Sequence, residues 1–204
     1  MKLNTLPTLL RRRIEVTETK TRLWADSDPT AFDTDRAFEQ LSPGASVLVL
    51  CNGNIFRSPM AERYLERHVE NYGLDLTVES AGFIPRPGRP SPDLAVEVAS
   101  EFGIDLSDHR SRRISDKMVA ANDVILLMDA RNYDSLRREF PDATEKTYFL
   151  KPFGPDGGYE ISDPVNTGFE ECRRVYGEVE RAIDALVTRL DEAHTARDER
   201  VTSL

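Results

Sequence analysis

The residues from Cys51 to Ser58, Cys-Asn-Gly-Asn-Ile-Phe-Arg-Ser, place a thiol and a guanidinium in one short stretch of chain. A thiolate is a strong nucleophile, and a guanidinium can bind two oxygens of one phosphate at once. We therefore interpret this stretch as a phosphate-binding loop with a nucleophile, Cys51, at its base and Arg57 as the residue that binds the anion.

The other residues of the loop suit close contact with an anion. Gly53 allows the backbone to approach a ligand, and Asn54 is one of the few non-glycine residues that tolerate a left-handed conformation. A helical pattern follows, and the N-terminus of a helix offers N–H groups and positive potential to a phosphate. These positive surroundings should favour the thiolate of Cys51, and Ser58 can donate a hydrogen bond to its sulfur.

A proton for the leaving oxygen has to come from another part of the chain. The sequence Ile161-Ser162-Asp163-Pro164 lies in a long loop, and a carboxylic acid on a loop suits this task. Asp163 would first protonate the leaving group and then deprotonate the water that frees the enzyme. Aspartate before proline also starts ordinary turns, so the residues alone leave both interpretations open.

The spacing Cys-x5-Arg-Ser is short enough to occur by chance, so its context matters. An apolar run, Val47–Leu50, precedes the loop and a helical pattern begins at Pro59. This strand–loop–helix order strengthens the functional interpretation. The alternative, a cysteine that only fills a small apolar site at a strand end, leaves Arg57 and Ser58 unexplained.

Short apolar runs alternate with helical patterns along most of the chain. Such alternation predicts an α/β fold with a parallel sheet that helices cover on both faces. The strands are expected at Ser46–Leu50, Leu76–Ser80, Asp123–Met128 and Lys146–Leu150, and the helices at Pro59–Tyr72, Pro92–Phe102, Asn132–Phe140 and Gly168–Leu190. One face of the last helix is apolar, with Cys172, Val175, Val179, Ile183, Leu186 and Leu190.

Ligands of parallel α/β sheets bind beyond the carboxyl ends of the strands. Cys51, Ser80 and Asp129 all fall at or next to such ends. We therefore expect these three residues to lie in one binding site.

The chain divides into a main domain and two flanking segments. Residues 46–192 carry the alternating pattern, residues 1–45 form an N-terminal extension, and residues 193–204 form a polar C-terminal tail. We interpret the extension as a surface-packed or partly disordered arm and expect it to be dispensable for chemistry. The other interpretation is a segment that binds a partner or covers the site.

The extension contains a charge cluster, Arg11–Arg13, that we interpret as solvated. It also contains Trp24, which we expect to be dispensable for the chemistry. A helix is expected from Pro29 to Leu41, because Asp28 can cap it and proline suits the first helical position. Phe32, Phe38 and Leu41 would form its apolar side.

Composition limits the classes of partner and the cellular compartment that fit this chain. A net charge of −9 over 204 residues argues against nucleic acid as the main partner. The two cysteines, Cys51 and Cys172, form no disulfide framework and fit a reducing cytoplasm. We recognise no secretion signal, and no run approaches the roughly 18 apolar residues of a membrane helix. The oligomeric state is left open.

The motifs resemble those of the low-molecular-weight protein tyrosine phosphatases over roughly residues 47–190. Several separated matches occur in the same order, which is far more specific than one loop. They are Cys51-x-Gly53-Asn54-Ile55-x-Arg57-Ser58-Pro59-Met60-Ala61-Glu62, Val78-Glu79-Ser80-Ala81-Gly82, Gly103–Arg112, Leu127-Met128-Asp129 and Asp163-Pro164.

The resemblance implies a flavodoxin-like, three-layer αβα fold with a four-stranded parallel sheet in the order 2-1-3-4. It implies Cys51 as nucleophile, Arg57 as phosphate and transition-state binder, and Asp163 as general acid and base, with no metal and no cofactor. The substrate would be a phosphorylated protein and inorganic phosphate a product. The implied phosphate-binding residues are Asn52, Gly53, Asn54, Ile55, Phe56 and Ser58, and the supporting residues are Ser80, His109 and Asp129.

The chain departs from the family pattern at three places. Phe56 stands where many relatives carry a second cysteine, so a protective disulfide with Cys51 is predicted absent. Val165 follows Asp163-Pro164 where tyrosine-directed members often carry aromatic residues, so the pocket wall must come from elsewhere, with Phe83, Tyr133 or the extension as candidates. Asn52 occupies a position that is often apolar or threonine.

Four functions compete. The first is a metal-independent phosphotyrosine phosphatase, and the second is a protein arginine phosphatase on the same scaffold. Phosphoarginine relatives tend to have threonine where Ile55 stands, which favours the first. An arsenate reductase needs further cysteines to pass a disulfide along, and Cys172 in the final helix is a poor candidate. A phosphate-binding module without activity would not need Cys51, Arg57 and Asp163 together.

Overall fold

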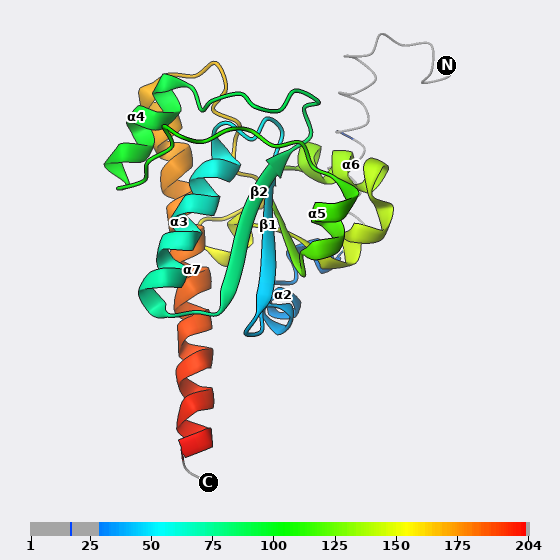
Figure 1. Cartoon of the computed structure of the whole chain (residues 1–204), viewed down its shortest axis with the longest axis vertical. Coiled ribbons are helices and arrows are strands. Elements are labelled where there is room, and N and C mark those ends of the chain that lie inside the picture. The colour runs from blue at the N-terminus through cyan, green and yellow to red at the C-terminus, as the bar shows by residue number, and fades with distance from the viewer. Residues whose placement is uncertain (1–16, 18–28, 203–204) are drawn as a thin grey trace.

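The computed structural model describes residue 17 and residues 29–202. Its sheet has four parallel strands, β1 (Ala45–Cys51), β2 (Leu76–Gly82), β3 (Val124–Leu127) and β4 (Thr147–Phe149), in the order β2-β1-β3-β4 (Figure 1). The predicted strands and their order are confirmed. The Arg11–Arg13 cluster and Trp24 lie outside the described residues.

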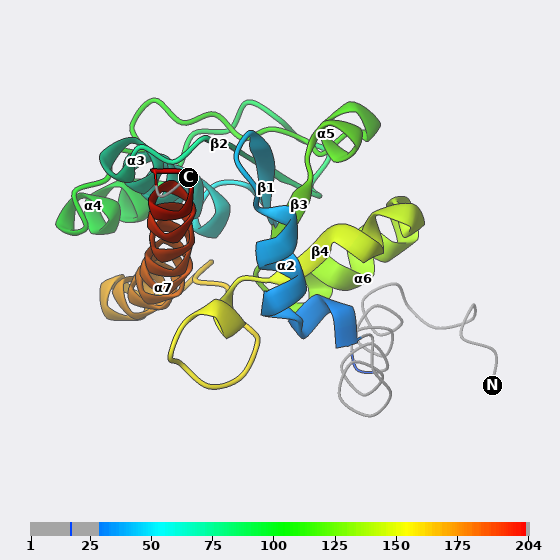
Figure 2. The ribbon, with the colours of Figure 1, turned by 90° about the horizontal axis from the view of Figure 1, so that it is seen from below.

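Helices cover both faces of the sheet (Figure 2). On one face lie α3 (Arg57–Tyr72), α4 (Asp93–Glu101) and α7 (Phe169–Thr202), and on the other lie α5 (Asp116–Ala121) and α6 (Ala130–Glu139). Short 3-10 helices, η3 (Pro141–Lys146) and η4 (Lys151–Phe153), flank β4. The three-layer αβα architecture is therefore confirmed. None of the helices in the described ranges is long and apolar enough to span a bilayer.

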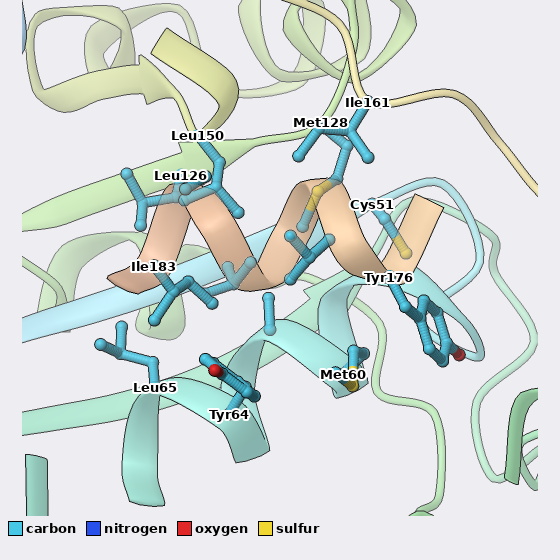
Figure 3. Packing of buried hydrophobic residues seen from close by; sticks show 14 of the residues in the cluster. Cys51, Met60, Tyr64, Leu65, Leu126, Met128, Leu150, Ile161, Tyr176 and Ile183 are labelled. Atoms are coloured by element: carbon cyan, nitrogen blue, oxygen red, sulfur yellow. The ribbon is translucent and has the colours of Figure 1, made fainter. Parts of the chain in front are cut away.

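The side chains of β1 alternate between two hydrophobic clusters because successive residues of a strand point to opposite faces. Val47 and Val49 join the cluster with α3 and α7, whereas Leu48 and Leu50 join the cluster with α6. Cys51 belongs to the first cluster, and Figure 3 shows it beside the other labelled side chains of the sheet, α3 and α7. The reactive end of β1 thus rests on a packed core.

Helix α7 is longer than the sequence patterns predicted. Its predicted apolar face, from Cys172 to Leu190, is buried as expected. The helix continues to Thr202, and Figure 1 shows its final turns extending past the amino ends of the strands. The residues after Leu190 contain neither glycine nor proline, so no local signal stops the helix there.

The segment before β1 crosses the β4 edge of the sheet. The single helix predicted from Pro29 to Leu41 is wrong: η2 (Pro29–Phe32) is a 3-10 helix, and Asp33 then caps α2 (Thr34–Gln40) by accepting a hydrogen bond from the Arg36 amide. Phe32 stacks on Phe149 in one cluster, while Phe38 packs against Phe153 in the other. The two phenylalanines therefore do not share one apolar side.

This packing predicts that residues 29–43 stabilise the domain. Ala31, Ala37 and Leu41 are buried, so a chain beginning at Gly44 should lose on the order of 5 kcal/mol of unfolding free energy. Urea unfolding of that chain, compared with one beginning at Pro29, measures the loss. Equal stability of the two chains would show that the segment contributes nothing to the fold.

Candidate active site

Cys51 ends β1, and the loop that follows supplies two hydrogen bonds to its sulfur. The amide of Asn54 donates to Sγ at 3.2 Å, and the hydroxyl of Ser58 donates at 3.0 Å. Both donors are fully buried. Two hydrogen-bond donors from the loop and from the start of α3 therefore converge on one sulfur.

Asn54 holds the loop in shape. Its φ of 51° lies in the left-handed region, as the sequence predicted. Its side-chain amide donates to the hydroxyls of Ser58 at 2.9 Å and Ser80 at 2.7 Å, and its side-chain oxygen accepts from the Arg112 amide at 2.7 Å. Asn54 thereby orients the hydroxyl that reaches the Cys51 sulfur.

A carboxylate that sequence reasoning left without a role supports Ser80. Glu62 accepts from the Ser80 hydroxyl at 2.7 Å and forms an ion pair with Arg112 at 2.9 Å. Burial raises the pKa of Glu62, and the bonds from Ser80 and Arg112 oppose that rise. The sequence did contain a signal for this contact: Glu62 lies one helical turn after Ser58, on the same side of α3.

His109 contacts the loop from outside. Its Nε2 lies 2.9 Å from the carbonyl oxygen of Asn54. Burial lowers the pKa of His109 in spite of this bond, so the ring is neutral at neutral pH and carries its proton on Nε2 to donate to the carbonyl. The structure therefore places His109 in contact with the backbone of the loop.

Arg57 is the largest fully buried side chain and is held by three residues from two segments. Its Nη1 donates to Asp129 at 2.7 Å and to the Ile161 carbonyl at 2.8 Å, and its Nη2 lies 3.1 Å from Asp163. Burial disfavours the charge, but Asp129, Cys51 and Asp163 outweigh it and raise the pKa of Arg57.

The Nε of Arg57 is buried and has no hydrogen-bond partner among the residues that the structure describes. A buried donor without an acceptor is costly, and an anion at the loop would satisfy it. The guanidinium is therefore positioned by acids on one side and still has a donor for a ligand.

The two acids at Arg57 differ in how firmly they are placed. Asp129 is buried, and its Oδ1 also caps α6 by accepting from the Asn132 amide at 2.9 Å. Asp163 comes from the long loop before α7, and a quarter of its side chain is exposed. Asp129 thus holds Arg57 from a fixed position, whereas Asp163 can contact both Arg57 and solvent.

The remaining loop residues connect Cys51 to the neighbouring strand and helix. The carbonyl of Asn52 accepts from the amides of Phe83 and Ile84, and a Cβ on Gly82 would lie only 2.9 Å from that carbonyl oxygen. Glycine is therefore required at the end of β2 for the loop to pack there. Phe56 is buried in the core, and α3 begins at Arg57, slightly before the predicted start at Pro59.

Comparisons with known proteins agree with this geometry. Residues 46–196 match the sequence profile of the family described as "Low molecular weight phosphotyrosine protein phosphatase". The chain belongs to this family. The expected enzyme class, low-molecular-weight protein-tyrosine-phosphatase, is confirmed at the level of the family, whose members act on phosphorylated proteins.

Relatives of this phosphatase cover most of its length. It is 36% identical to the low molecular weight protein-tyrosine-phosphatase Wzb of Escherichia coli over 137 residues, which is 67% of this chain and 89% of Wzb. It is also similar to the solved structure of the YwlE arginine phosphatase from Geobacillus stearothermophilus, with 31% identity and a TM-score of 0.66 over 74% of this chain and 96% of that one. A solved low molecular weight protein tyrosine phosphatase from T. tengcongensis gives 32% identity and a TM-score of 0.66 over 71% and 99%.

Two of the three predicted candidates for the pocket wall belong to the core, and most of the third, the N-terminal extension, lies outside the described residues. Phe83 and Tyr133 are both buried in the second hydrophobic cluster. Val165, just after Asp163-Pro164, is instead one of the exposed large apolar side chains of the described chain, with 44% of its surface accessible.

Cys172 differs from Cys51 in its surroundings. It is fully buried on α7, and burial raises the pKa of its thiol to about 11. No disulfide joins the two cysteines. At neutral pH we therefore expect a small alkylating reagent to modify Cys51 and leave Cys172 as an inert thiol, because the thiolate is the reactive form.

Peptide mass mapping after graded alkylation checks this expectation. Activity should fall in proportion to the label on Cys51, and inorganic phosphate should slow the labelling. Equal labelling of both cysteines at neutral pH would contradict the assignment of Cys172 as a packed thiol.

The charged residues near the loop are paired with one another rather than gathered around a cation. Among the described residues no group of three or more His, Cys, Asp or Glu side chains could hold a metal ion. The donors that face Cys51 are amide, hydroxyl and guanidinium groups, which suit an anionic ligand.

Proposed function

We propose that this protein hydrolyses phosphotyrosine in proteins without a metal, through a phosphocysteine intermediate on Cys51. The observation that carries the proposal is the convergence at one strand end of a hydrogen-bonded sulfur, an unsatisfied guanidinium Nε and a partly exposed carboxyl group. These are the nucleophile, the anion binder and the acid that phosphoryl transfer to a thiolate requires.

In the first step the Cys51 sulfur attacks phosphorus and the bond between phosphorus and the tyrosine oxygen breaks. The leaving phenolate takes the proton of Asp163, so tyrosine departs neutral. Arg57 binds phosphate oxygens as the charge on them spreads in the transition state. Loop amides from Asn52 to Phe56 provide the other donors.

In the second step Asp163, now a carboxylate, accepts a proton from water. The water oxygen attacks phosphorus, the sulfur–phosphorus bond breaks, and inorganic phosphate leaves. Ser58 favours this step because its hydrogen bond, seen here at 3.0 Å, stabilises the departing thiolate.

The contact between Asp163 and Arg57 fits the order of these steps. The carboxylate lies 3.1 Å from Nη2. A bound phosphate would compete with Asp163 for the same guanidinium, and the first step needs Asp163 as a proton donor.

Arginine-linked phosphate is the second candidate substrate, because the structure is similar to the YwlE arginine phosphatase at 31% identity. Ile55 favours phosphotyrosine, since an apolar side chain next to the bound phosphate suits a phenyl ring better than a guanidinium. Val165 offers an exposed apolar surface on the opposite loop.

Rates on matched phosphotyrosine, phosphoserine and phosphoarginine peptides test the substrate assignment. We expect phosphotyrosine to be hydrolysed fastest and the Ile55→Thr variant to shift the ratio toward phosphoarginine. The Cys51→Ser variant serves as the blank for all three. Faster hydrolysis of phosphoarginine by the unchanged protein would overturn the assignment in favour of the second candidate.

Asp163→Asn should slow turnover according to the leaving group. For a phenol of high pKa we expect a loss of about 10²–10³ in kcat, because the departing oxygen must be protonated. For a nitrophenol the loss should be much smaller, because that oxygen departs without a proton.

Asp156→Asn is the matched control, since Asp156 lies in the same loop and pairs with Arg181 instead. It should leave both rates unchanged. A uniform loss for good and poor leaving groups in Asp163→Asn would mean that another group supplies the proton.

A further inference from the structure

Three carbonyl oxygens of the phosphate-binding loop are capped by side chains from other segments. The Gly53 carbonyl accepts from Arg89, the Asn54 carbonyl from His109, and the Phe56 carbonyl from the Tyr176 hydroxyl at 3.3 Å. The cap with the greatest charge is the guanidinium of Arg89, a residue to which the proposed mechanism gives no role.

Arg89 is fixed in its position by its own segment. The chain between β2 and α4 crosses the end of the sheet where β1 stops (Figure 1). There the Arg89 backbone exchanges hydrogen bonds with Ser111, at 3.0 and 2.8 Å, and its Nε donates to the Arg86 carbonyl at 2.9 Å. The side chain is half-buried, and this bonding leaves its Nη2 directed at the Gly53 carbonyl.

The guanidinium also lies directly over the loop. A Cβ built on Gly53 would lie 3.7 and 3.8 Å from the two Nη atoms of Arg89. The cation therefore lies within van der Waals distance of the loop at Gly53.

The Gly53 carbonyl and the Asn54 amide are the two ends of one peptide unit. The Asn54 end donates to the Cys51 sulfur at 3.2 Å, while the Gly53 end accepts from Arg89. A cation at the oxygen end draws electron density from the nitrogen end, so the N–H becomes a stronger donor, as in other hydrogen-bonded chains.

We propose that Arg89 is a positioning residue that stabilises the Cys51 thiolate through the Gly53–Asn54 peptide. The proposal rests on the proposed function in assigning the thiolate as nucleophile. Its test measures ionisation of the thiol directly, so it can fail while the phosphatase activity stands, and it can succeed whatever the substrate proves to be.

The experiment is a titration of the thiolate by its ultraviolet absorbance, with the Cys51→Ser variant as blank. It compares the unchanged protein with Arg89→Met, Arg89→Lys and Arg86→Met. Arg86 is the matched control because it lies in the same loop and is exposed, and only its backbone carbonyl contacts Arg89.

In Arg89→Met we expect the midpoint of the titration to rise by about half to one pH unit, which corresponds to a roughly threefold to tenfold smaller thiolate fraction below the midpoint. Arg89→Lys should recover most of the shift, and Arg86→Met should show little of it. If Arg89→Met does not fold, Arg89→Gln, which keeps a donor but no charge, should show a smaller rise in the same direction.

Equal shifts in Arg89→Met and Arg86→Met would overturn the proposal, because they would indicate a general charge effect. An unchanged midpoint would overturn it as well. The proposal would also be overturned if the midpoint stayed the same and only KM for acidic phosphopeptides rose, because Arg89 would then bind substrate instead of positioning the loop.

Discussion

Replacing Cys51 with serine is expected to reduce hydrolysis of an aryl phosphate by at least about 10⁴-fold while the fold survives. The serine hydroxyl is similar in size, so the packing of the first hydrophobic cluster and the hydrogen bonds from Asn54 and Ser58 can persist. The two groups that hydrogen-bond to the sulfur are donors, so neither of them would take a proton from the serine hydroxyl. The loss should therefore appear in kcat rather than in phosphate binding.

Steady-state kinetics, circular dichroism and binding of inorganic phosphate measure these quantities together. Cys172→Ser is the control, because Cys172 is buried on α7 and has no role in the proposed chemistry. It should keep its activity, with some loss of stability. A Cys51→Ser variant with substantial activity would show that another group attacks phosphorus.

Arg57→Lys is expected to reduce kcat by about 10³-fold although the charge is kept. A guanidinium has donors for Asp129, the Ile161 carbonyl and a phosphate at the same time, as the contacts of Nη1, Nη2 and the unpaired Nε indicate. An ammonium group is a single point and cannot bind all of them. Stability should fall by about 1–3 kcal/mol, because a buried acceptor loses its partner.

Arg63→Lys is the matched control on the same helix, since Arg63 is exposed and pairs with Glu66. Its kcat should equal that of the unchanged protein. If Arg57→Lys retains kcat within about threefold, the bidentate contact to phosphate is not the basis of catalysis.

The sheet could be predicted from the sequence because its strands carry signals that need no tertiary information. Val47–Leu50 is apolar throughout, as a strand covered on both faces has to be, and the same holds for Val124–Leu127. The apolar face of α7, from Cys172 to Leu190, repeats over about five turns, so its burial could be predicted from spacing alone.

The parts that were missed depend on local capping and on contacts across the sheet edge. Helix α5 is short and has no buried residue, and its one sequence signal is Ser115, whose hydroxyl accepts from the Met118 amide. The break between η2 and α2 follows from Asp33, which caps a new helix in place of continuing the first. A periodicity argument over Pro29–Leu41 cannot detect such a break.

The residues of the phosphate-binding loop could be predicted from motif spacing, whereas the contacts that other segments make with the loop could not. Cys51, Asn54 and Ser58 are close in sequence, so the loop itself fixes their proximity. Arg89 and Tyr176 reach the same loop from distant segments, and nothing in their sequence surroundings indicates a contact with it. Such contacts require the tertiary structure.

Trapping the covalent intermediate tests the central claim most directly. The Asp163→Ala variant, mixed with a nitrophenyl phosphate and quenched with denaturant, should accumulate protein whose mass has increased by one PO3 group, because the water of the second step lacks its base. Peptide mapping should locate that group on Cys51. A phosphoryl group on any other residue, or rapid release of nitrophenol with no phosphorylated protein at any time, would contradict the account.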